Sequence, residues 1–565
     1  MAKVISIGNQ SFESIREKDN FYIDKTNFIR EWWDNDDTVT LITRPRRFGK
    51  TLNMSMLECF FSNKYKDRGD LFEGLEIWND EKYRKLQGTY PVIFLSFAEI
   101  KQNNYNDAVE KIKRIICEVC QQFDFLKNWD GLTEIEKKNI SNISYNMSDV
   151  MAQDLIKNMS NYLSRYYGKK VIILLDEYDT PMQEAYVNGY WEELVAFTRS
   201  LFNSTFKTNP YLERAIMTGI TRVSKESIFS DLNNLKVITV TSDEYSKCFG
   251  FTEDEVFAAL DEQGLSSEKE KVKLWYDGFT FGDKKDIYNP WSIINFLDEK
   301  KYKTYWADSS SNGLVNELIR TGSAEIKKTM ETLMAGGTVE KNIDEQIVFE
   351  QLKTNKDVVW SLLLASGYLR VETFRTEGRL NKKIYSLKLT NYEVEQMFGA
   401  MIERWFGGAD VPYNEFINAM LNGDIESMNE YMNRVTRGVI SYFDTGKTPS
   451  DEEPERFYHG LVLGLMVDQV DNYILNSNRE SGYGRYDIML EPIDKTNEKY
   501  PGIVIEFKVI NPRKESSLEE TVAVALKQIE EKNYDAELIK RGVKEENIHH
   551  YGFAFKGKEV LIDGR

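Results

Sequence analysis

The sequence has few cysteines and lacks any long apolar run. Its four cysteines are too few and too scattered in 565 residues for a disulfide framework, and the CxxC at Cys117 and Cys120 lies inside a helical pattern without a second pair, which disfavours zinc. The longest apolar runs, such as Val171–Leu175, are far shorter than the ~20 residues of a bilayer span. The start, MAKVISIGNQ, has no apolar segment of signal-peptide type. We therefore expect a soluble, reducing, cytoplasmic protein without membrane contact.

Positive charge is also scarce relative to negative charge. Acidic residues number 91 and basic residues 73, which gives a formal net charge of −18. Because this overall field repels nucleic acid, contact with DNA or RNA would need a local basic surface. Hydrophobic residues (41%) and aromatic residues (13%) are abundant enough to form packed cores and too abundant for a disordered chain. The length predicts several structural units.

The first part of the chain alternates short apolar runs with helical patterns. We expect strands at 38–43, 91–97, 171–175, 214–220 and 235–240, separated by helices at 51–61, 108–125, 149–167 and 191–206. Continuous apolar strands separated by helices are typical of a parallel sheet that is covered on both faces. The pattern therefore predicts one α/β domain over residues 1–245.

The remainder divides into a middle region and a C-terminal unit. Residues 246–400 are mostly helical in pattern, and a polar segment with two prolines at 444–454 is typical of a linker or exposed loop. The last unit, within 401–565, begins with helical stretches. It then shows a helix at 455–467, strands at 485–490 and 503–509, a helix at 517–534 and a strand pair at 551–555 and 559–562. This is an α+β pattern.

A candidate phosphate-binding loop follows the first strand. The segment RPRRFGKT, at 44–51, joins that strand to a helix, as in a P-loop, and its backbone N–H groups would face phosphates. Lys50 would reach the β- and γ-phosphates and Thr51 would bind Mg²⁺. The candidate nucleotide-binding residues are Arg46, Arg47, Phe48, Gly49, Lys50 and Thr51. Arg44 stands where the usual motif has its first glycine, and a merely basic turn is the alternative.

Two acidic residues follow the third strand. Parallel strands deliver their carboxyl ends to the same edge of a sheet, so Asp176 and Glu177 are expected beside the loop. Asp176 would hold Mg²⁺, and Glu177 would polarise the attacking water. The fourth strand ends in MTGITR, at 217–222, where a polar residue could sense the γ-phosphate; ordinary loop chemistry is the alternative.

These motifs resemble a bacterial family of AAA-ATPase-like proteins with a C-terminal PD-(D/E)XK nuclease-like domain. The resemblance is carried by FYIDKT (21–26), RPRRFGKT, LLDEYDTP (174–181), TGITRVSKESIFSDLNNL (218–235) and YNPWSI (288–293). It implies a RecA/AAA-like parallel-sheet domain that binds ATP, and a lid-like or winged-helix-like middle region packed on it. Within the resemblance Asp24 and Lys25 either border the nucleotide or form a structural turn.

A second constellation lies in the C-terminal unit. Alternation along the strands puts Glu506 and Lys508 on one face, and a neighbouring strand could bring Asp487 to the same point. Two carboxylates can bind Mg²⁺ and a lysine can orient or deprotonate water, which is the chemistry of phosphodiester cleavage. A solvated strand face, or a folded domain that has lost cleavage, is the alternative.

The order of elements around this constellation resembles the restriction-endonuclease-like PD-(D/E)XK core. Glu455 and His459 on the preceding helix could add a metal ligand, and Gln528 with Tyr534 is similar to the glutamine motif of some such nucleases. Tyr486 replaces the usual proline. His549 and His550 are expected to be structural or exposed.

The leading hypothesis is therefore an ATP-binding, ATP-hydrolysing protein whose nucleotide state controls a Mg²⁺-dependent nuclease acting on DNA or RNA. The alternative is a nucleotide-switched signalling or scaffold NTPase whose nuclease-like domain only binds. A helicase motor is a weaker hypothesis, since only the two shared NTPase motifs are present. The sequence leaves the oligomeric state open.

Overall fold

The structure is a computed structural model that resolves most of the chain into two compact units. It describes residues 3–221, 228–229, 232–309, 315, 318–319, 324–334, 336–343, 358–378, 382–406, 413–439, 472–477, 480–481, 484–485, 487–497, 499–511, 514–556 and 559–565. Unit 1 comprises Met1–Ser311 and Thr338–Val394, and unit 2 comprises Asn312–Gly337 and Glu395–Arg565. In the part described, no helix has both the length and the apolar character needed to cross a membrane.

A five-stranded parallel sheet forms the centre of the N-terminal part of unit 1. Its order is β2-β3-β4-β1-β5, with bounds β1 Val39–Thr43, β2 Val92–Ser96, β3 Val171–Asp176, β4 Leu212–Gly219 and β5 Leu235–Ile238. Every residue of β1 and of β3 is buried, as the continuous apolar runs predict. The predicted parallel α/β sheet is therefore confirmed, and β4 lies between β1 and β3.

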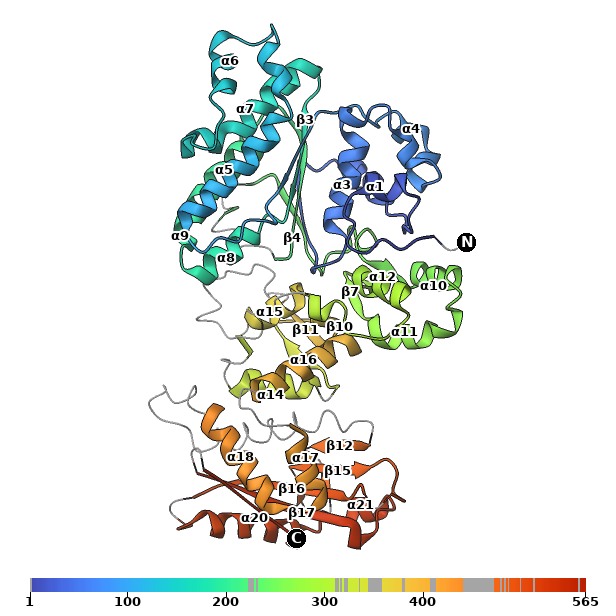
Figure 1. The fold of residues 1–565 in the computed structure, drawn as a ribbon, viewed down its shortest axis with the longest axis vertical. Coiled ribbons are helices and arrows are strands. Elements are labelled where there is room, and N and C mark those ends of the chain that lie inside the picture. Colours follow the sequence, from blue (N-terminus) through green and yellow to red (C-terminus); the bar gives the residue numbers. More distant parts are fainter. Residues whose placement is uncertain are drawn as a thin grey trace. The chain divides into compact units, whose positions relative to one another are not determined.

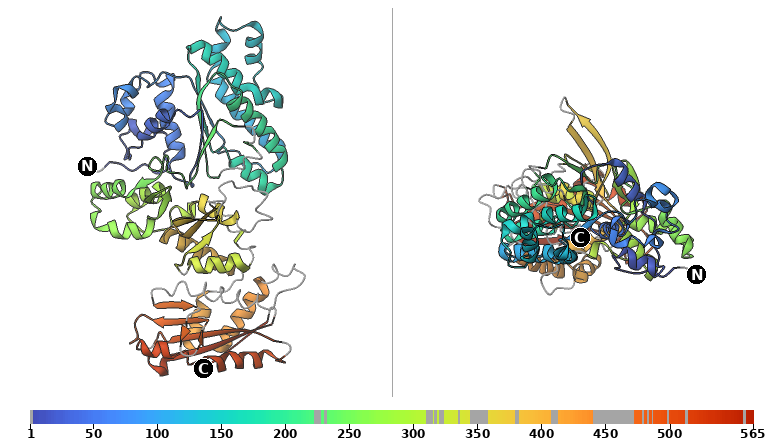
Figure 2. Two further views of the ribbon diagram at one scale, coloured as in Figure 1. Left: turned by 180° about the vertical axis from the view of Figure 1, so that it is seen from behind. Right: turned by 90° about the horizontal axis from the view of Figure 1, so that it is seen from above.

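Helices cover both faces of this sheet (Figures 1 and 2). The helix α3 (Lys50–Phe61) lies on one side together with α1 (Phe12–Glu17), while α5 (Tyr105–Gln121), α7 (Asp149–Tyr167) and α9 (Trp191–Phe202) lie on the other (Figure 1). The remaining helices of this part are α2 (Asn27–Asn35), α4 (Glu81–Arg84), α6 (Glu134–Ser141) and α8 (Thr180–Asn188). An aromatic core that includes Trp32, Phe60 and Phe61 packs between α2, α3 and the sheet.

The rest of unit 1 contains more strand than the sequence predicts. A small sheet of order β6-β8-β7 (Phe251–Thr252, Lys284–Tyr288, Phe279–Phe281) is accompanied by α10 (Glu253–Glu262), α11 (Lys269–Tyr276) and α12 (Pro290–Glu299). A second sheet has the order β10-β11-β9 (Leu369–Glu377, Lys382–Leu389, Val339–Lys341), preceded by α15 (Val358–Ala365). The mostly helical interpretation of this region is corrected accordingly. These strands are short or exposed, so they lack a continuous apolar run.

The long hairpin β10–β11 extends outward (Figure 2), and its tip from Thr373 to Glu377 is exposed. Next in the chain, α16 (Tyr392–Phe406) begins in unit 1, and the boundary between the units falls after Val394.

Unit 2 is built on a mixed five-stranded sheet of order β12-β15-β16-β17-β18. Its strands are β12 Tyr473–Ser477, β15 Ile488–Pro492, β16 Gly502–Val509, β17 Ile548–Lys556 and β18 Glu559–Gly564. The strands β16 and β17 are parallel and joined through α20 (Leu518–Lys532), while the other pairs are antiparallel. The strands predicted at 485–490, 503–509, 551–555 and 559–562 are confirmed within a few residues, whereas β12 was missed.

The two faces of this sheet bury different cores. Ile503, Ile505 and Phe507 pack against α17 (Tyr413–Asn422) and α18 (Ile425–Val439). Val504, with Met489 of β15, packs against α20. The alternation therefore places Glu506 and Lys508 on the α20 face, as predicted. Also in unit 2 are α14 (Ala324–Met334), α21 (Ala536–Lys540) and the two-stranded sheet of β13 (Glu480–Ser481) and β14 (Gly484–Arg485). The predicted linker and the helix at 455–467 lie outside the described residues.

Candidate active sites

The loop between β1 and α3 turns through two residues with a left-handed backbone conformation. Gly49 precedes the helix in the left-handed region, at φ +77°, which favours glycine there. Arg47 also has a positive φ, +66°, a conformation that costs a non-glycine residue roughly 1–2 kcal/mol. The helix N-terminus at Lys50 points its unpaired N–H groups into the turn. The segment therefore folds as the sequence predicts.

Arg44, which replaces the first glycine of the motif, is an internal anchor. Its side chain is fully buried, and its guanidinium donates to the carbonyl oxygens of Thr43 and Thr239 at 2.9 and 2.7 Å. It also lies 4.5 Å from the centre of the Phe281 ring. Burial lowers the Arg44 pKa to about 10, so the side chain stays charged at neutral pH. Arg44 therefore anchors the loop through its side chain, at the position where the usual motif has a glycine that permits a tight turn.

Lys50 lies inside the loop. Its ammonium group donates to the carbonyl oxygens of Arg44 (3.0 Å) and Pro45 (2.9 Å). Burial lowers the pKa of Lys50, and the nearby carboxylates of Glu177 and Asp176 oppose that shift. The structure thus brings the lysine of the loop and the acids after β3 to the same edge of the sheet.

Asp176 is the centre of this site. Its buried carboxylate accepts hydrogen bonds from the hydroxyl of Thr51, at 2.7 Å, and from that of Thr218 at the end of β4. Burial raises the pKa of Asp176, and the two hydroxyl donors work against that rise. Glu177 follows at a positive φ of +52°, is partly exposed, and accepts from Thr180 at 3.1 Å. A threonine hydroxyl beside a carboxylate is a ligand set of the kind that Mg²⁺ prefers.

The three loop residues before Gly49 differ in their surroundings. Arg46 and Arg47 are exposed, and the Arg47 guanidinium lies 4.4 Å from the centre of the Trp291 ring. The Phe48 ring is buried against Phe279 and Phe281, so any contribution of Phe48 to nucleotide binding would come from its backbone. The structure therefore groups these predicted residues in one loop. The two arginine side chains are exposed, and the Phe48 ring is buried.

Asp179 was given no role in the sequence analysis, although it lies in the quoted LLDEYDTP motif. It is buried and accepts from the backbone N–H groups of Ile220 (3.1 Å) and Thr221 (2.9 Å) and from the Thr221 hydroxyl (2.9 Å). A side-chain Cβ at Gly219 would lie 2.6 Å from this carboxylate, so only glycine fits there. Asp179 thus fixes the loop after β4. The only signal in the sequence is an acid three residues after Asp176.

Asp24 and Lys25 both have structural contacts. The Asp24 carboxylate accepts from the Thr26 backbone N–H, at 2.8 Å, and from that of Glu76, at 2.7 Å. Lys25 is buried and forms an ion pair with Glu255 at 2.7 Å. Of the two alternatives left open by the sequence, the structural turn is supported.

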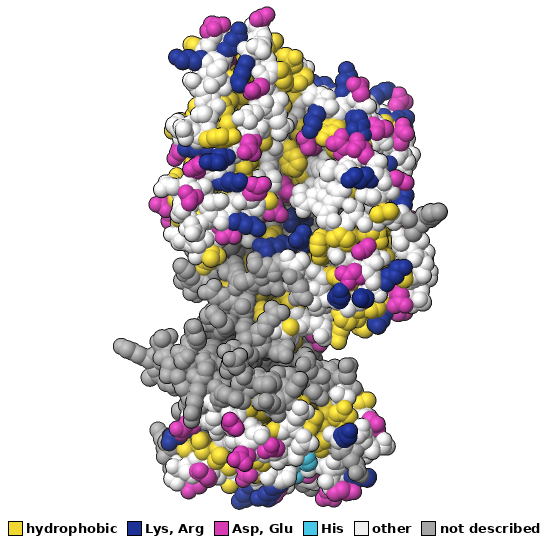
Figure 3. Space-filling model, in the orientation of Figure 1, with side chains coloured by type: hydrophobic (Ala, Val, Ile, Leu, Met, Phe, Trp, Pro, Cys, Tyr) yellow, Lys and Arg dark blue, Asp and Glu magenta, His cyan; other side chains and the backbone are white. Residues whose placement is uncertain are grey.

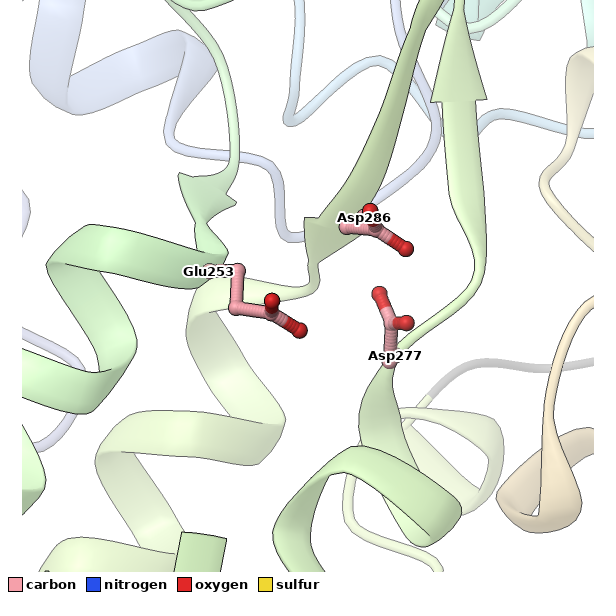
Figure 4. A group of neighbouring side chains, drawn as sticks. All are labelled: Glu253, Asp277 and Asp286. Atoms are coloured by element: carbon pink, nitrogen blue, oxygen red, sulfur yellow. The ribbon is translucent and has the colours of Figure 1, made fainter. Parts of the chain in front are cut away.

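A further acidic cluster lies beside the small sheet of unit 1. One carboxylate oxygen from each of Glu253, Asp277 and Asp286 lies within 4.8 Å of the others, and Figure 4 shows them converging from α10, the end of α11 and β8. Lys273 donates to Glu253. Burial and the charge of Asp286 raise the pKa of Asp277 to about 7. Sequence reasoning missed this cluster because its members are 33 residues apart (286 − 253) without a motif.

The second predicted site lies on the α20 face of unit 2. Asp487, just before β15, accepts from the Phe507 backbone N–H at 2.8 Å, which places it beside the β16 residues Glu506 and Lys508. Glu506 is buried and its carboxylate accepts from the Lys508 ammonium at 2.8 Å. The structure thus brings together the three residues that the sequence grouped.

Gln528 and Tyr534 complete the surroundings of Glu506. The Gln528 amide donates both to Glu506 and, at 3.1 Å, to the Tyr534 hydroxyl. The pKa of Tyr534 is raised, first by burial and then by the charges of Glu506 and Asp487. Two carboxylates on one sheet face fit a divalent cation, since hard oxygen donors are its preferred ligands.

Several predicted residues lie elsewhere. His549 lies 3.1 Å from the Tyr551 hydroxyl and His550 forms a 2.7 Å pair with Asp535, so both have structural contacts, as expected. Glu455, His459 and Tyr486 fall outside the described residues, as does Arg222, the last residue of the MTGITR segment. On the face drawn in Figure 3, acidic and basic side chains are interspersed over the described surface of unit 1.

Comparison with known proteins supports both domains. Residues 6–229 match a family model described as "Predicted AAA-ATPase", and residues 453–564 match one described as "PD-(D/E)XK nuclease superfamily". An uncharacterized protein encoded in the region 5′ of vnfD in Azotobacter chroococcum mcd 1 is 24% identical over 396 residues, which cover 70% of this chain and 68% of that protein. The five-stranded parallel sheet and the mixed C-terminal sheet fit these assignments. The chain therefore carries an AAA-ATPase-like domain followed by a C-terminal PD-(D/E)XK nuclease superfamily domain.

Proposed function

We propose that the N-terminal site binds and hydrolyses ATP. The observation that carries this proposal is the meeting of Lys50, Thr51 and Asp176 at one edge of the sheet, with Thr51 bonded to Asp176 at 2.7 Å. Lys50 would exchange its two carbonyl partners for phosphate oxygens, to which an ammonium bonds more strongly. The backbone of Arg46–Gly49 would supply N–H donors to the phosphates.

Mg²⁺ would be held by Thr51 and Asp176 and, when bound, would neutralise charge on the phosphate groups. Glu177 would orient the attacking water and accept its proton; its partial exposure leaves the carboxylate accessible to solvent. Thr218, bonded to Asp176, would sense the γ-phosphate end of the site. These roles make the domain an ATP hydrolase.

We further propose that the C-terminal domain cleaves DNA or RNA. Asp487 and Glu506 would hold Mg²⁺, which when bound would polarise the scissile phosphate. Lys508, bonded to Glu506 at 2.8 Å, would orient or deprotonate the attacking water. Gln528 donates to the same oxygen of the Glu506 carboxylate. With a formal charge of −18, the protein would need basic residues gathered near this site to hold nucleic acid.

The division of the chain at about 245 and 400 is part of the same proposal, with the middle region packed on the ATPase. The nucleotide state of the first domain would control the last. A cytoplasmic location is also proposed, in keeping with four cysteines that are all buried free thiols.

The test uses the full-length protein and two single variants. Phosphate release from ATP and cleavage of single- and double-stranded DNA and RNA are measured with Mg²⁺ or Mn²⁺. Glu177→Gln should abolish phosphate release while ATP still binds, and Asp487→Asn should abolish cleavage while phosphate release continues. Cleavage that survives Asp487→Asn would contradict the assigned nuclease site. Nucleotide-dependent binding of nucleic acid without cleavage under any metal would favour the switch-and-scaffold alternative instead.

A further inference from the structure

The phosphate-binding loop is enclosed by residues from much later in the chain. Gly367, at φ +88°, approaches so closely that a Cβ on it would lie 2.9 Å from the Pro45 ring. The Gly250 backbone N–H donates to the Phe48 carbonyl at 3.4 Å, and the Phe48 ring packs against Phe279. The loop is thus held from outside as well as by its own turn.

The Arg46 carbonyl oxygen is a backbone atom of the loop that these later residues bind. The indole N–H of Trp306 donates to it at 3.0 Å, and the side-chain amide of Asn289 at 3.3 Å. Both donor residues are buried, with exposed fractions of 2% and 0%. Two buried side chains from outside the loop therefore bind one peptide oxygen in it.

Both donors are themselves fixed. Asn289 caps α12, because its side-chain oxygen accepts from the Trp291 backbone N–H at 2.8 Å. The Trp306 backbone N–H donates at 2.6 Å to Glu393, a fully buried carboxylate that also accepts from Ser292 at 2.8 Å. Both donor residues are therefore held by contacts outside the loop as well as by the Arg46 carbonyl.

Because the peptide bond is planar and trans, fixing the direction of the Arg46 C=O also fixes the direction of the next N–H group. The C=O of Arg46 and the N–H of Arg47 belong to one peptide unit, and in a trans peptide they point in opposite directions. Cis peptide bonds are absent from the described residues. Holding the Arg46 oxygen toward Trp306 and Asn289 therefore turns the Arg47 N–H to the opposite side of the loop.

We propose that Trp306 and Asn289 are positioning residues for nucleotide binding: they orient the Arg46–Arg47 peptide so that the Arg47 N–H donates to a phosphate oxygen of the bound nucleoside di- or triphosphate. This inference rests on the proposed function of the loop. It also gives the YNPWSI motif a role, since Asn289 is its second residue. The positive φ of Arg47 is held in place by the same contacts.

The test measures equilibrium affinity for ADP and ATP in the full-length chain. Trp306→Phe removes the indole donor and keeps an aromatic ring; Asn289→Asp keeps the helix cap and replaces the donor by an acceptor that repels the Arg46 oxygen. Each should weaken nucleotide binding roughly 10- to 100-fold, the loss of about one hydrogen bond to a charged group. Tyr276→Phe is the matched control, because it removes a buried 3.0 Å hydrogen bond to Lys303 in the same region without touching the loop.

The outcomes distinguish failure of the proposed function from failure of the positioning role. If wild type binds no nucleotide, the proposed function is overturned, and this inference with it. If wild type binds and both variants bind equally well, only the positioning role is overturned. Equal loss in the two variants and in Tyr276→Phe would show general destabilisation and would likewise overturn it. Weaker binding in the two variants, with Tyr276→Phe binding like wild type, is the expected result.

Discussion

The Thr51 hydroxyl donates a 2.7 Å hydrogen bond to Asp176, 125 residues further along the chain. Asp176 ends β3, and Thr51 lies in α3, which follows β1. The strand β4 lies between β1 and β3, and Thr218 near the end of β4 donates to the same carboxylate. The site thus spans three parallel strands at their carboxyl ends, where α/β sheets usually bind ligands.

Asp176→Asn should stabilise the nucleotide-free protein while abolishing ATP hydrolysis. The pKa of Asp176 is raised in the folded state by burial, so folding loses stability as pH rises from the ordinary carboxyl pKa, about 4, toward the folded value. Asparagine carries no charge and avoids that loss. Thermal unfolding should therefore show a higher midpoint for the variant at pH 8 and a smaller difference near pH 4. A lower midpoint for the variant at pH 8 would contradict this.

Asp179→Ala should destabilise the loop after β4. It would leave the buried backbone N–H groups of Ile220 and Thr221 without their acceptor, at a cost of about 1–3 kcal/mol. Asp179→Asn keeps an acceptor oxygen and serves as the control. Urea unfolding measures both. Equal stability of the alanine and asparagine variants would show that the Asp179 carboxylate does not hold this loop.

Local patterns in the sequence were sufficient to predict the parallel sheet of unit 1 and the meeting of Lys50 and Asp176 at its edge. The apolar runs of β1 and β3 mark buried parallel strands, and the carboxyl-end rule then brings Lys50 to Asp176. The contact between Arg46 and Trp306, 260 residues apart, has no such local signal. It depends on how the middle region packs on the loop, and the hydrophobic periodicity of the sequence does not predict that packing.

Glu506→Gln should abolish nucleic-acid cleavage. Partners that only orient a metal ligand change affinity or activity by about 10–100-fold, so replacing Glu506, which we propose as a direct ligand, should lower the rate at least ~100-fold. Glu491→Gln is the matched control: Glu491 is buried in the same sheet and paired with Arg541 at 2.6 Å and Lys495 at 2.9 Å. It should lower stability by roughly 1–3 kcal/mol without stopping cleavage. Cleavage assays together with unfolding curves distinguish the two variants. Equal loss of cleavage in both would contradict the proposed nuclease site at Glu506.

The prediction of the C-terminal site rested on alternation along one strand and on a neighbouring strand that could bring Asp487 to the same point. IEFK puts Glu506 and Lys508 on one face whatever the surrounding fold, and the structure covers that face with α20. The edge strand β12 was missed because YILNS is short and polar at its end. The pairing of β12 with β15 could not be predicted from the sequence, because other chain segments separate the two strands.

Asp277→Asn should change the pH dependence of stability. The pKa of Asp277 is raised to about 7 by burial and by the charge of Asp286, so the folded protein loses stability as pH rises from about 4 through about 7. The variant lacks that loss. Its stability relative to wild type, measured by urea unfolding across this range, should increase with pH and level off above 7. A difference that does not vary with pH would show that the pKa of Asp277 is not raised in the folded protein.

The most direct measurement of the central claim is ATP affinity in the presence of Mg²⁺ for two isosteric lysine variants of the full-length chain. Lys50→Met removes the ammonium of the loop, and Lys25→Met removes a buried ammonium that is paired with Glu255 in the same unit. We predict that Lys50→Met binds ATP at least ~10-fold more weakly, the loss of one charge-assisted contact, while Lys25→Met binds like wild type. Equal affinity of wild type and Lys50→Met would contradict the claim that Lys50, Thr51 and Asp176 form a nucleotide site.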